Sequence, residues 1–186
     1  MTRLALLRHA DTAWSASSRI QGRADVPLRD GISLDCSFCK GMRVVTSPLS
    51  RCVQTAALLG APDAAHEPRI TEMDWGEWEG RTLAELRAEL GDAMAQNEAR
   101  GLDFRPPGGE SPRSVIERIK PWLRKIAAAG VPTLAVTHRG VIRAILAEAS
   151  GWDMRGKPPA KLDWRAVHFF MLDAQGRPSV ERLNVR

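Results

Sequence analysis

Short apolar runs and amphipathic stretches alternate along the chain, and each predicts one element of regular structure. The apolar runs fit buried strands by their length and composition; they cover residues 3–7, 43–46, 133–137, 167–172 and 180–183. Strands that alternate with helices imply βαβ crossovers and a mainly parallel sheet covered on both faces. The pattern therefore predicts an α/β fold with three layers, an α/β/α sandwich around a mainly parallel central sheet.

Helical periodicity and capping residues predict four longer helices. Ser47 followed by Pro48 is a typical helix start, with a capping residue before a proline at the first helical position. Pro121 lies inside the third segment and should kink it or break it into two. The predicted helices run from Pro48 to about Gly60, from Thr82 to about Asn97, from Pro112 to about Gly130, and from Val141 to Gly151.

Length and composition indicate an ordinary globular chain. The 186 residues, 44% hydrophobic and 26% charged, suit a single domain over residues 1–186. No stretch approaches the roughly 20 apolar residues of a membrane span, so we expect no membrane partner. The apolar run at residues 4–7 is too short for the core of a signal peptide. We therefore expect a cytoplasmic protein.

The net charge of +5 favours an anionic partner. The basic residues are scattered, without a run of five or more and without interleaved aromatic residues that stack on bases. We therefore expect a small phosphorylated substrate and no nucleic acid.

Three cysteines, an odd number, argue against a disulfide framework. Cys36 and Cys39 form a CxxC pair, but no second pair and no nearby histidine complete a zinc site. We interpret both as ordinary thiols and expect no metal.

Two of the predicted strands end in the same kind of residue. The first runs into Arg8-His9 and the strand at 133–137 runs into His138-Arg139. A histidine at a strand end is more often structural than catalytic. In open parallel sheets, however, ligands bind at the carboxyl ends of the strands. The coincidence marks this edge as a candidate site.

Six motifs follow one another in an informative order: LLRHADTAW, RIQGRADVPL, SPLSRCVQTA, EMDWGEWEG, PPGGES and VTHRGVIR. Together they resemble the histidine phosphatase (phosphoglycerate mutase-like) superfamily, and most closely its short bacterial branch that includes alpha-ribazole phosphatases. The resemblance covers Leu4 to about Trp152. It implies a phosphoglycerate mutase-like fold and a phosphomonoesterase that needs no cofactor.

The resemblance also assigns roles to individual residues. His9 would be the phosphorylated nucleophile, and Arg8, Arg51 and His138 would form the phosphate pocket. Glu72 would be the proton donor. Ser15, Gln21 and Gly22 fall where the family lines the mouth of its substrate site.

Elementary chemistry makes these roles sensible. Guanidinium groups grip phosphate oxygens, and neighbouring cations keep His9 neutral and nucleophilic. The helix that begins near His138 would add its positive end to the pocket. Glu72 would protonate the leaving alkoxide, and no step in this scheme needs a metal.

Several positions depart from the family pattern. Ala10 replaces the usual glycine, Ser15 stands where asparagine is common, and Arg139 replaces a small or varied residue. The segment between Leu28 and Arg43 is shorter than the family's first helix. Its apolar residues alternate with strand-like period: Ile32, Leu34, Cys36 and Phe38. We expect a truncated or remodelled helix there, exposed apolar surface on the sheet, and a homodimer that covers it.

Two other functions fit the same motifs. A cofactor-dependent phosphoglycerate mutase must shut out water, and we expect this chain to be too short for the required insertions and tail. A phosphate-binding module without turnover is disfavoured by the joint presence of His9, Glu72 and His138. The substrate stays open among alpha-ribazole 5′-phosphate, sugar phosphates, nucleotides and protein phosphohistidine.

Overall fold

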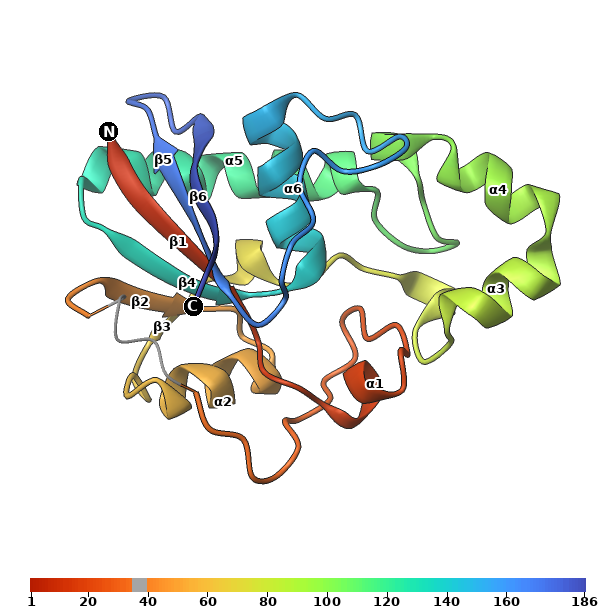
Figure 1. The fold of residues 1–186 in the computed structure, drawn as a ribbon, viewed down its shortest axis with the longest axis horizontal. Helices are drawn as coiled ribbons and strands as arrows, with labels where there is room; N and C mark the ends of the chain where they lie inside the picture. Colours follow the sequence, from red (N-terminus) through yellow and green to blue (C-terminus); the bar gives the residue numbers. More distant parts are fainter. Residues whose placement is uncertain (35–39) are drawn as a thin grey trace.

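A six-stranded sheet forms the centre of the molecule in a computed structural model that describes residues 1–34 and 40–186 (Figure 1). The first four strands across the sheet are parallel, and the last two run antiparallel to their neighbours. The sheet is therefore mainly parallel, as predicted. In order across the sheet the strands are β3 (Ala65–His66), β2 (Arg43–Thr46), β4 (Thr133–Thr137), β1 (Thr2–Arg8), β5 (Val167–Leu172) and β6 (Pro178–Val185).

The central strands β1 and β4 end side by side. Their register pairs Leu6 with Ala135 and Arg8 with Thr137. The N–H of His9 then donates to the carbonyl oxygen of Thr137 at 2.9 Å. His9 and His138, which follow the two strands, are thereby brought to the same edge of the sheet, as their strand ends predicted.

Helices cover both faces of the sheet (Figure 1). On one face, α5 (Pro112–Ala129) and α6 (Arg139–Ser150) pack on a core that includes Leu6 and Ala135. On the other face, α2 (Ser50–Leu58) packs its Cys52 and Ala56 against Val136. Neighbouring residues of β4 thus point to opposite faces, as the two-residue period of a strand requires. The three-layer prediction is confirmed.

The start of α2 differs from the prediction. The helix begins at Ser50 with Leu49 as its N-cap, not at Ser47-Pro48. The hydroxyl of Ser47 lies 2.8 Å from Nε2 of His138 and is thus engaged at the edge of the sheet. The end near Gly60 is confirmed.

The single helix predicted from Thr82 to about Asn97 is wrong. Two helices occupy this segment, α3 (Leu83–Leu90) and α4 (Asp92–Glu98). Gly91 separates them with φ +50° and ψ −122°, a left-handed conformation that interrupts helical hydrogen bonding. Both helices extend away from the sheet on the side of its carboxyl edge (Figure 1).

Helix α5 runs unbroken through Pro121, so of the two predicted outcomes the break is wrong and the kink stays a prediction. Pro121 lies on the exposed side of the helix, between the buried residues of its other face. Water can therefore solvate the carbonyl group that loses its N–H partner.

Short elements connect the layers, and β3 is one that the sequence pattern did not predict. The helical turns are α1 (Ala13–Ala16), η2 (Pro68–Ile70), η3 (Gly76–Trp78) and η4 (Gly101–Asp103). No helix of the described residues is long and apolar enough to cross a membrane.

The described residues between Leu28 and Arg43, which are 29–34 and 40–42, form neither helix nor strand. Cys36, Phe38 and Cys39 lie outside the described residues. On the α2 face of the sheet, the side chains of Ala5, Leu7 and Phe169 are no more than 9% exposed, whereas Val44 and Val185 are only partly buried. The expected exposed apolar surface is therefore absent at the first three positions, and the homodimer stays a prediction.

Candidate active site

The five residues predicted to carry the chemistry meet at the carboxyl edge of β1 and β4. His9, Arg51, Glu72 and His138 are all less than 9% exposed, and the side chain of Arg8 is 10% exposed. The imidazole rings of His9 and His138 lie with centroids 5.3 Å apart. Three basic groups, two of them arginines, thus surround one buried histidine.

The hydrogen bond of His9 fixes its tautomer. Nδ1 lies 2.7 Å from the carbonyl oxygen of Ala10, which can only accept, so Nδ1 carries the proton. Burial, and then the charges of Arg8 and Arg51, hold the pKa of His9 well below its usual value. The ring is therefore neutral near pH 7, with its lone pair on Nε2.

Arg8 contributes a charge that is largely uncompensated. Its Nε is buried without a hydrogen-bond partner in the described part of the chain. Its Nη1 is 3.8 Å from the carboxylate of Asp11. Burial, followed by the charge of Arg139, lowers the pKa of Arg8, as expected for a cation held in a site for an anion.

Arg51 is fully buried and supports a loop beside the two histidines. Its Nη1 donates to the carbonyl oxygen of Ala24 and its Nη2 to that of Gly22, both at 2.7 Å. Each nitrogen keeps a second N–H. The guanidinium thus links the loop at residues 22–24 to the histidines.

Both ring nitrogens of His138 have protein partners. Nδ1 accepts from Nε of Arg51 at 3.4 Å, so Nε2 carries the proton and donates to the hydroxyl of Ser47 at 2.8 Å. Burial, and then the neighbouring His9 and Arg51, lower the pKa of His138 well below its usual value. In this arrangement a neutral His138 orients Arg51, and its direct contact with phosphate stays a prediction.

Glu72 lies against the N-terminus of α6. Its Oε1 accepts the N–H of Gly140 at 3.0 Å and that of Met73 at 2.8 Å. Burial raises the pKa of Glu72, although these hydrogen bonds oppose the shift. A helix N-terminus attracts negative charge, and the positive end of α6, which we expected to act on the phosphate, donates its Gly140 N–H to this carboxylate.

Two residues that position the site were missed in the sequence. Arg118 on α5 donates to the carbonyl oxygens of Thr71 at 2.7 Å and Glu72 at 3.1 Å, and to the carboxylate of Glu110. Glu79 accepts the N–H groups of Arg23 at 2.7 Å and Ala24 at 3.0 Å. Glu79 stands in the EMDWGEWEG motif, whereas Arg118 lies on a polar helix face without any local signal.

The three residues expected at the mouth of the site, Ser15, Gln21 and Gly22, make local contacts in the structure. Ser15 and Thr12 cap α1 reciprocally, and the side-chain oxygen of Gln21 accepts the hydroxyl of Thr12 at 2.9 Å. A Cβ at Gly22, where φ is +50°, would lie 1.8 Å from Oε1 of Glu79. Only glycine fits there, and the carbonyl oxygen of Gly22 accepts a hydrogen bond from Arg51.

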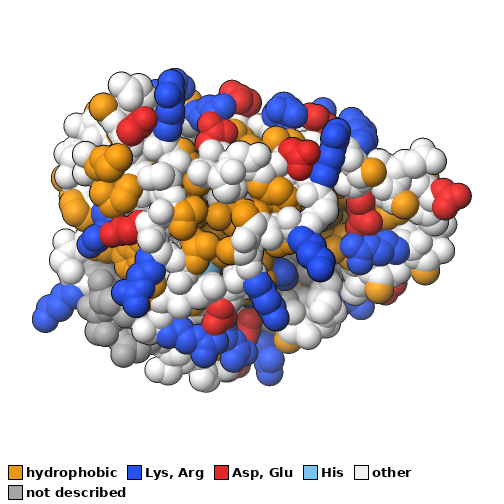
Figure 2. Space-filling view, turned by 45° about the horizontal axis from the view of Figure 1, so that its top comes forward, with side chains coloured by type: hydrophobic (Ala, Val, Ile, Leu, Met, Phe, Trp, Pro, Cys, Tyr) orange, Lys and Arg blue, Asp and Glu red, His pale blue; other side chains and the backbone are white. Residues whose placement is uncertain are grey.

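Positive charge is present inside the site as well as on the surface. Figure 2 shows Lys and Arg side chains spread across the visible face with Asp and Glu side chains between them. In the described residues, no three His, Cys, Asp or Glu side chains are grouped as ligands for a metal ion. The local attraction for an anion therefore comes from Arg8, Arg51 and Arg139.

Fold and site together define an α/β protein with a buried, uncharged histidine between arginines at the carboxyl edge of its sheet. Residues 37–186 match the model of the histidine phosphatase superfamily (branch 1), and the chain belongs to this superfamily. Arg8 and His9 precede the matched residues, so their place in the site rests on the geometry above.

Relatives in this superfamily include mutases and phosphatases. A 2,3-bisphosphoglycerate-dependent phosphoglycerate mutase from Gloeobacter violaceus is 32% identical over 165 residues, which cover 80% of this chain and 75% of the relative. A glucosyl-3-phosphoglycerate phosphatase from Mycolicibacterium vanbaalenii is 32% identical over 172 residues, which cover 80% of this chain and 74% of the relative. Sequence similarity thus extends to both activities.

Solved structures support the fold. A mycobacterial glucosyl-3-phosphoglycerate phosphatase in complex with VO3 has a TM-score of 0.80 and 23% identity, over the whole of both chains. A phosphoserine phosphatase from Entamoeba histolytica, in complex with phosphoserine, has a TM-score of 0.81 and 23% identity over 99% of this chain and 97% of that one. The phosphoglycerate mutase-like fold is therefore confirmed, and the narrower resemblance to alpha-ribazole phosphatases stays a prediction.

Proposed function

We propose that the protein is a phosphomonoesterase that hydrolyses a small phosphorylated metabolite through a phosphohistidine on His9. The observation that carries the proposal is the fixed tautomer of His9. Its Nδ1–H is held by the carbonyl group of Ala10 at 2.7 Å, and its Nε2 keeps a lone pair beside arginine charges. A neutral nucleophile next to cations is what attack on a phosphate ester requires.

In the first step, Nε2 of His9 attacks phosphorus and forms the N–P bond while the ester P–O bond breaks. Glu72 gives its proton to the leaving alkoxide, and the raised pKa of Glu72 favours the protonated form that this needs. Arg8 and Arg51 bind the phosphoryl oxygens on which charge accumulates.

In the second step, water attacks the phosphohistidine. Glu72, now ionised, takes a proton from this water, the N–P bond breaks, and inorganic phosphate leaves. The cycle returns Glu72 to its protonated form and His9 to its neutral form, so no reductant, oxidant or second substrate is consumed.

Replacing His9 tests the proposal. The His9→Ala protein should lose at least roughly a thousandfold in turnover of p-nitrophenyl phosphate, which is about 4 kcal/mol of transition-state stabilisation. A phosphoryl label that is labile in acid and stable in base should appear on wild type alone. His66→Ala, at an exposed histidine away from the site, is the matched control. Near-normal turnover by the His9→Ala protein would refute the assignment.

A mutase is the second candidate because phosphoglycerate mutases are among the relatives at 30% identity or more. Mutase chemistry would move phosphate between hydroxyl groups of phosphoglycerate instead of releasing it. Incubation with 3-phosphoglycerate and catalytic 2,3-bisphosphoglycerate separates the two. We expect inorganic phosphate as the product, and 2-phosphoglycerate without phosphate release would favour the mutase.

The physiological substrate calls for a panel of phosphate esters. The panel should include alpha-ribazole 5′-phosphate, which the motif resemblance suggests, together with glucosyl-3-phosphoglycerate and phosphoserine, which relatives and structural neighbours act on or bind. Sugar phosphates, nucleotides and a phosphohistidine protein complete it. We propose that a small metabolite will be preferred over the protein substrate.

A further inference from the structure

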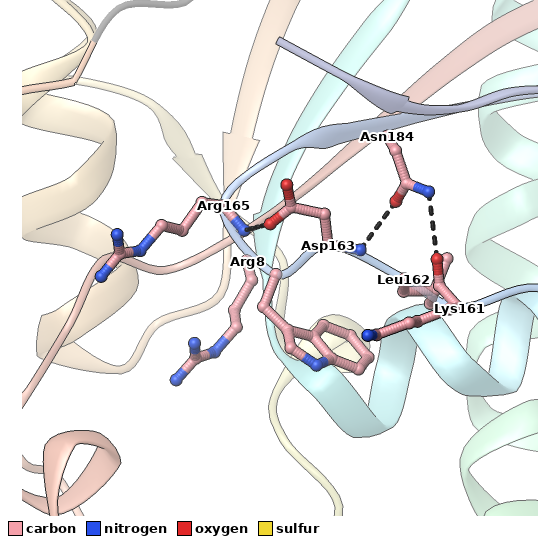
Figure 3. Close-up of a pocket in the computed structure, with 7 residues that line it drawn as sticks. Arg8, Lys161, Leu162, Asp163, Arg165 and Asn184 are labelled. Atoms are coloured by element: carbon pink, nitrogen blue, oxygen red, sulfur yellow. Dashed lines mark hydrogen bonds between the residues drawn. The ribbon is translucent and has the colours of Figure 1, made fainter.

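The two arginines nearest the histidines are held in different ways. The guanidinium of Arg8 makes no hydrogen bond to the other residues drawn in Figure 3, and its Nε has no partner in the described part of the chain. Arg51 is instead held by backbone, because its Nη1 and Nη2 donate to the carbonyl oxygens of Ala24 and Gly22 at 2.7 Å. The position of Arg51 therefore depends on the loop at residues 22–24.

One peptide group of this loop joins Arg51 to Glu79. Nη2 of Arg51 donates to the carbonyl oxygen of Gly22 at 2.7 Å. The N–H of Arg23, at the other end of the same peptide group, donates to Oε1 of Glu79 at 2.7 Å. A trans peptide unit is planar, with its C=O and N–H on opposite sides. Carboxylate, peptide group and guanidinium therefore form one hydrogen-bonded series, in which each bond polarises the next.

The N–H of Arg23 depends on Glu79 more than its neighbour does. The N–H of Ala24 donates to Oε2 of Glu79 at 3.0 Å and also to the carbonyl oxygen of Gln21 at 3.0 Å. The N–H of Arg23 has no second acceptor among the described residues. Without Glu79, only water would take this N–H, and water does not fix the orientation of the peptide group.

Charge and position predict opposite effects of Glu79 on phosphate. Burial lowers the pKa of Arg51, and Glu79 is among the negative charges that oppose this shift. A carboxylate this close to Arg51 also repels a phosphate bound there. If charge alone mattered, a neutral residue in place of Glu79 would strengthen phosphate binding. If Glu79 orients Arg51, the same replacement weakens it.

We propose that Glu79 is a positioning residue for phosphate binding and acts through Arg51. Its carboxylate fixes the peptide group between residues 22 and 23, and that peptide group aims the guanidinium at the phosphoryl group. This assignment rests on the proposed phosphatase function. It gives the last carboxylate of the EMDWGEWEG motif a role in the reaction that is separate from the acid role of Glu72.

Calorimetric titration with inorganic phosphate tests the proposal without turnover. The Glu79→Ala protein should bind phosphate at least about tenfold more weakly than wild type, as expected when a hydrogen bond to a charged group is lost. Glu79→Gln removes the same charge but keeps an acceptor for the Arg23 N–H, so it should recover most of the loss. Formate, a carboxylate small enough for the vacated space, should restore part of the affinity of the Glu79→Ala protein and should not strengthen binding by wild type.

Glu98→Ala is the matched control. It removes the same charge from an exposed ion pair with Arg87, whose Nη2 lies 2.7 Å from the carboxylate of Glu98. An exposed pair contributes little, so phosphate affinity should stay within about twofold of wild type. Unchanged or tighter phosphate binding by Glu79→Ala would overturn the proposal. So would a loss that neither Glu79→Gln nor formate recovers, because it would indicate general damage to the fold.

A double-mutant cycle shows whether Glu79 acts through Arg51. Arg51→Lys keeps the positive charge but lacks the planar fork that reaches two carbonyl oxygens. Adding Glu79→Ala to Arg51→Lys should cost less than about threefold in further phosphate affinity, because residues that act through one another are not additive. A second loss as large as the first would place the action of Glu79 elsewhere and overturn the proposal.

The acid segment is the other place where Glu79 makes contact. Its Oε1 accepts the N–H of Trp75 at 3.3 Å, three residues after Glu72. A loss that acts through Arg51 should affect alkyl and aryl esters alike, because both carry the same phosphoryl group. Losses in kcat/KM of equal size for the two esters are therefore expected for Glu79→Ala. A loss confined to alkyl esters would assign Glu79 to the acid and overturn the proposal.

The phosphate titrations also separate this proposal from the proposed function. If Glu79→Ala weakens phosphate binding through Arg51 while wild type hydrolyses no ester, the positioning assignment holds and the phosphatase assignment fails. If wild type forms the phosphohistidine but its phosphate affinity does not depend on Glu79, the positioning assignment alone is overturned. A wild-type protein that binds no phosphate overturns both.

Discussion

Glu72→Gln is the substitution that most directly tests how the leaving group is protonated. The change keeps the shape of the side chain and removes the acid. Oε1 can still accept the N–H groups of Met73 and Gly140, at 2.8 and 3.0 Å in wild type. Because a buried carboxylate with a raised pKa is replaced by a neutral amide, we expect the folded protein to lose little stability.

The expected effect on rate depends on the leaving group. General acid catalysis is worth about 10²–10⁴ in rate when an alkoxide must be expelled. That is roughly 3–5 kcal/mol of activation free energy. For p-nitrophenyl phosphate the leaving group is stable as an anion, so phosphorylation of His9 should be almost unchanged in the Glu72→Gln protein.

The pH profile supplies a second signature. His9 must be neutral and Glu72 protonated, and the structure lowers the pKa of the first and raises that of the second. For alkyl esters, kcat/KM should therefore fall as pH rises through the raised pKa of Glu72. This alkaline limb should be absent for the aryl ester and in the Glu72→Gln protein.

Pre-steady-state measurement of the first step keeps dephosphorylation from masking the result. Glu77→Gln, at an exposed carboxylate of the same loop, is the matched control. Equal losses for alkyl and aryl esters would refute the acid role and make Glu72 a positioning residue. The acid would then be sought at Asp11, Asp74 or Glu77, the last of which the Glu77→Gln protein already tests. Of these, Asp74 accepts the N–H of Gly76 at 2.8 Å.

Three further predictions follow from the same geometry. Gly140→Ala places a Cβ 2.4 Å from Oε1 of Glu72, so it should reproduce the alkyl-selective loss; full alkyl activity would show that the carboxylate position is unimportant. Burial lowers the pKa of His9, His138 and His168 in the fold, so the unfolded chain binds more protons below its own histidine pKa of about 6.5. The stabilisation from these neutral histidines is thus fully present above that pH. Below it, the free energy of unfolding should fall by up to about 1.4 kcal/mol per pH unit for each histidine. Urea unfolding midpoints at pH 7.5 and 5.5 measure this fall, and equal midpoints would contradict it. Activity should survive EDTA while vanadate and orthophosphate inhibit competitively, and activity lost on chelation and restored by a divalent ion would point to another mechanism.

The sequence predicted the part of the site that depends on strand ends. Apolar runs of strand length identified β1 and β4, and parallel pairing then required His9 and His138 to share one edge. Arg51 and Glu72 came from the motif resemblance. The structure brings both to the same buried cluster, although periodicity alone gave no reason to choose them.

Positions that depend on tertiary contacts could not be read from the sequence. Arg118 is a charged residue on the polar side of α5, and only the folded chain shows that it donates hydrogen bonds to the carbonyl oxygens of Thr71 and Glu72. Gly91 is compatible with a continuous helix, yet its left-handed conformation turns the chain between α3 and α4. In each case a long-range contact or a backbone conformation decides the structure, and the weak helical preference of the local sequence does not.

The position of β1 between β4 and β5 has a consequence for folding. Leu4 is paired with Thr133 and Leu6 with His168, so the strand that precedes His9 finds its hydrogen-bond partners only in the last third of the chain. During synthesis β1 therefore stays unpaired, with its apolar side chains exposed to water, until that part of the chain emerges from the ribosome. Such late closure makes folding slow and leaves the nascent chain open to aggregation or chaperone binding. The rate at which hydrolysis recovers after dilution from denaturant would therefore report the rate at which β1 pairs with β4. The N–H of His9 can donate to the carbonyl oxygen of Thr137 only when both strands are paired.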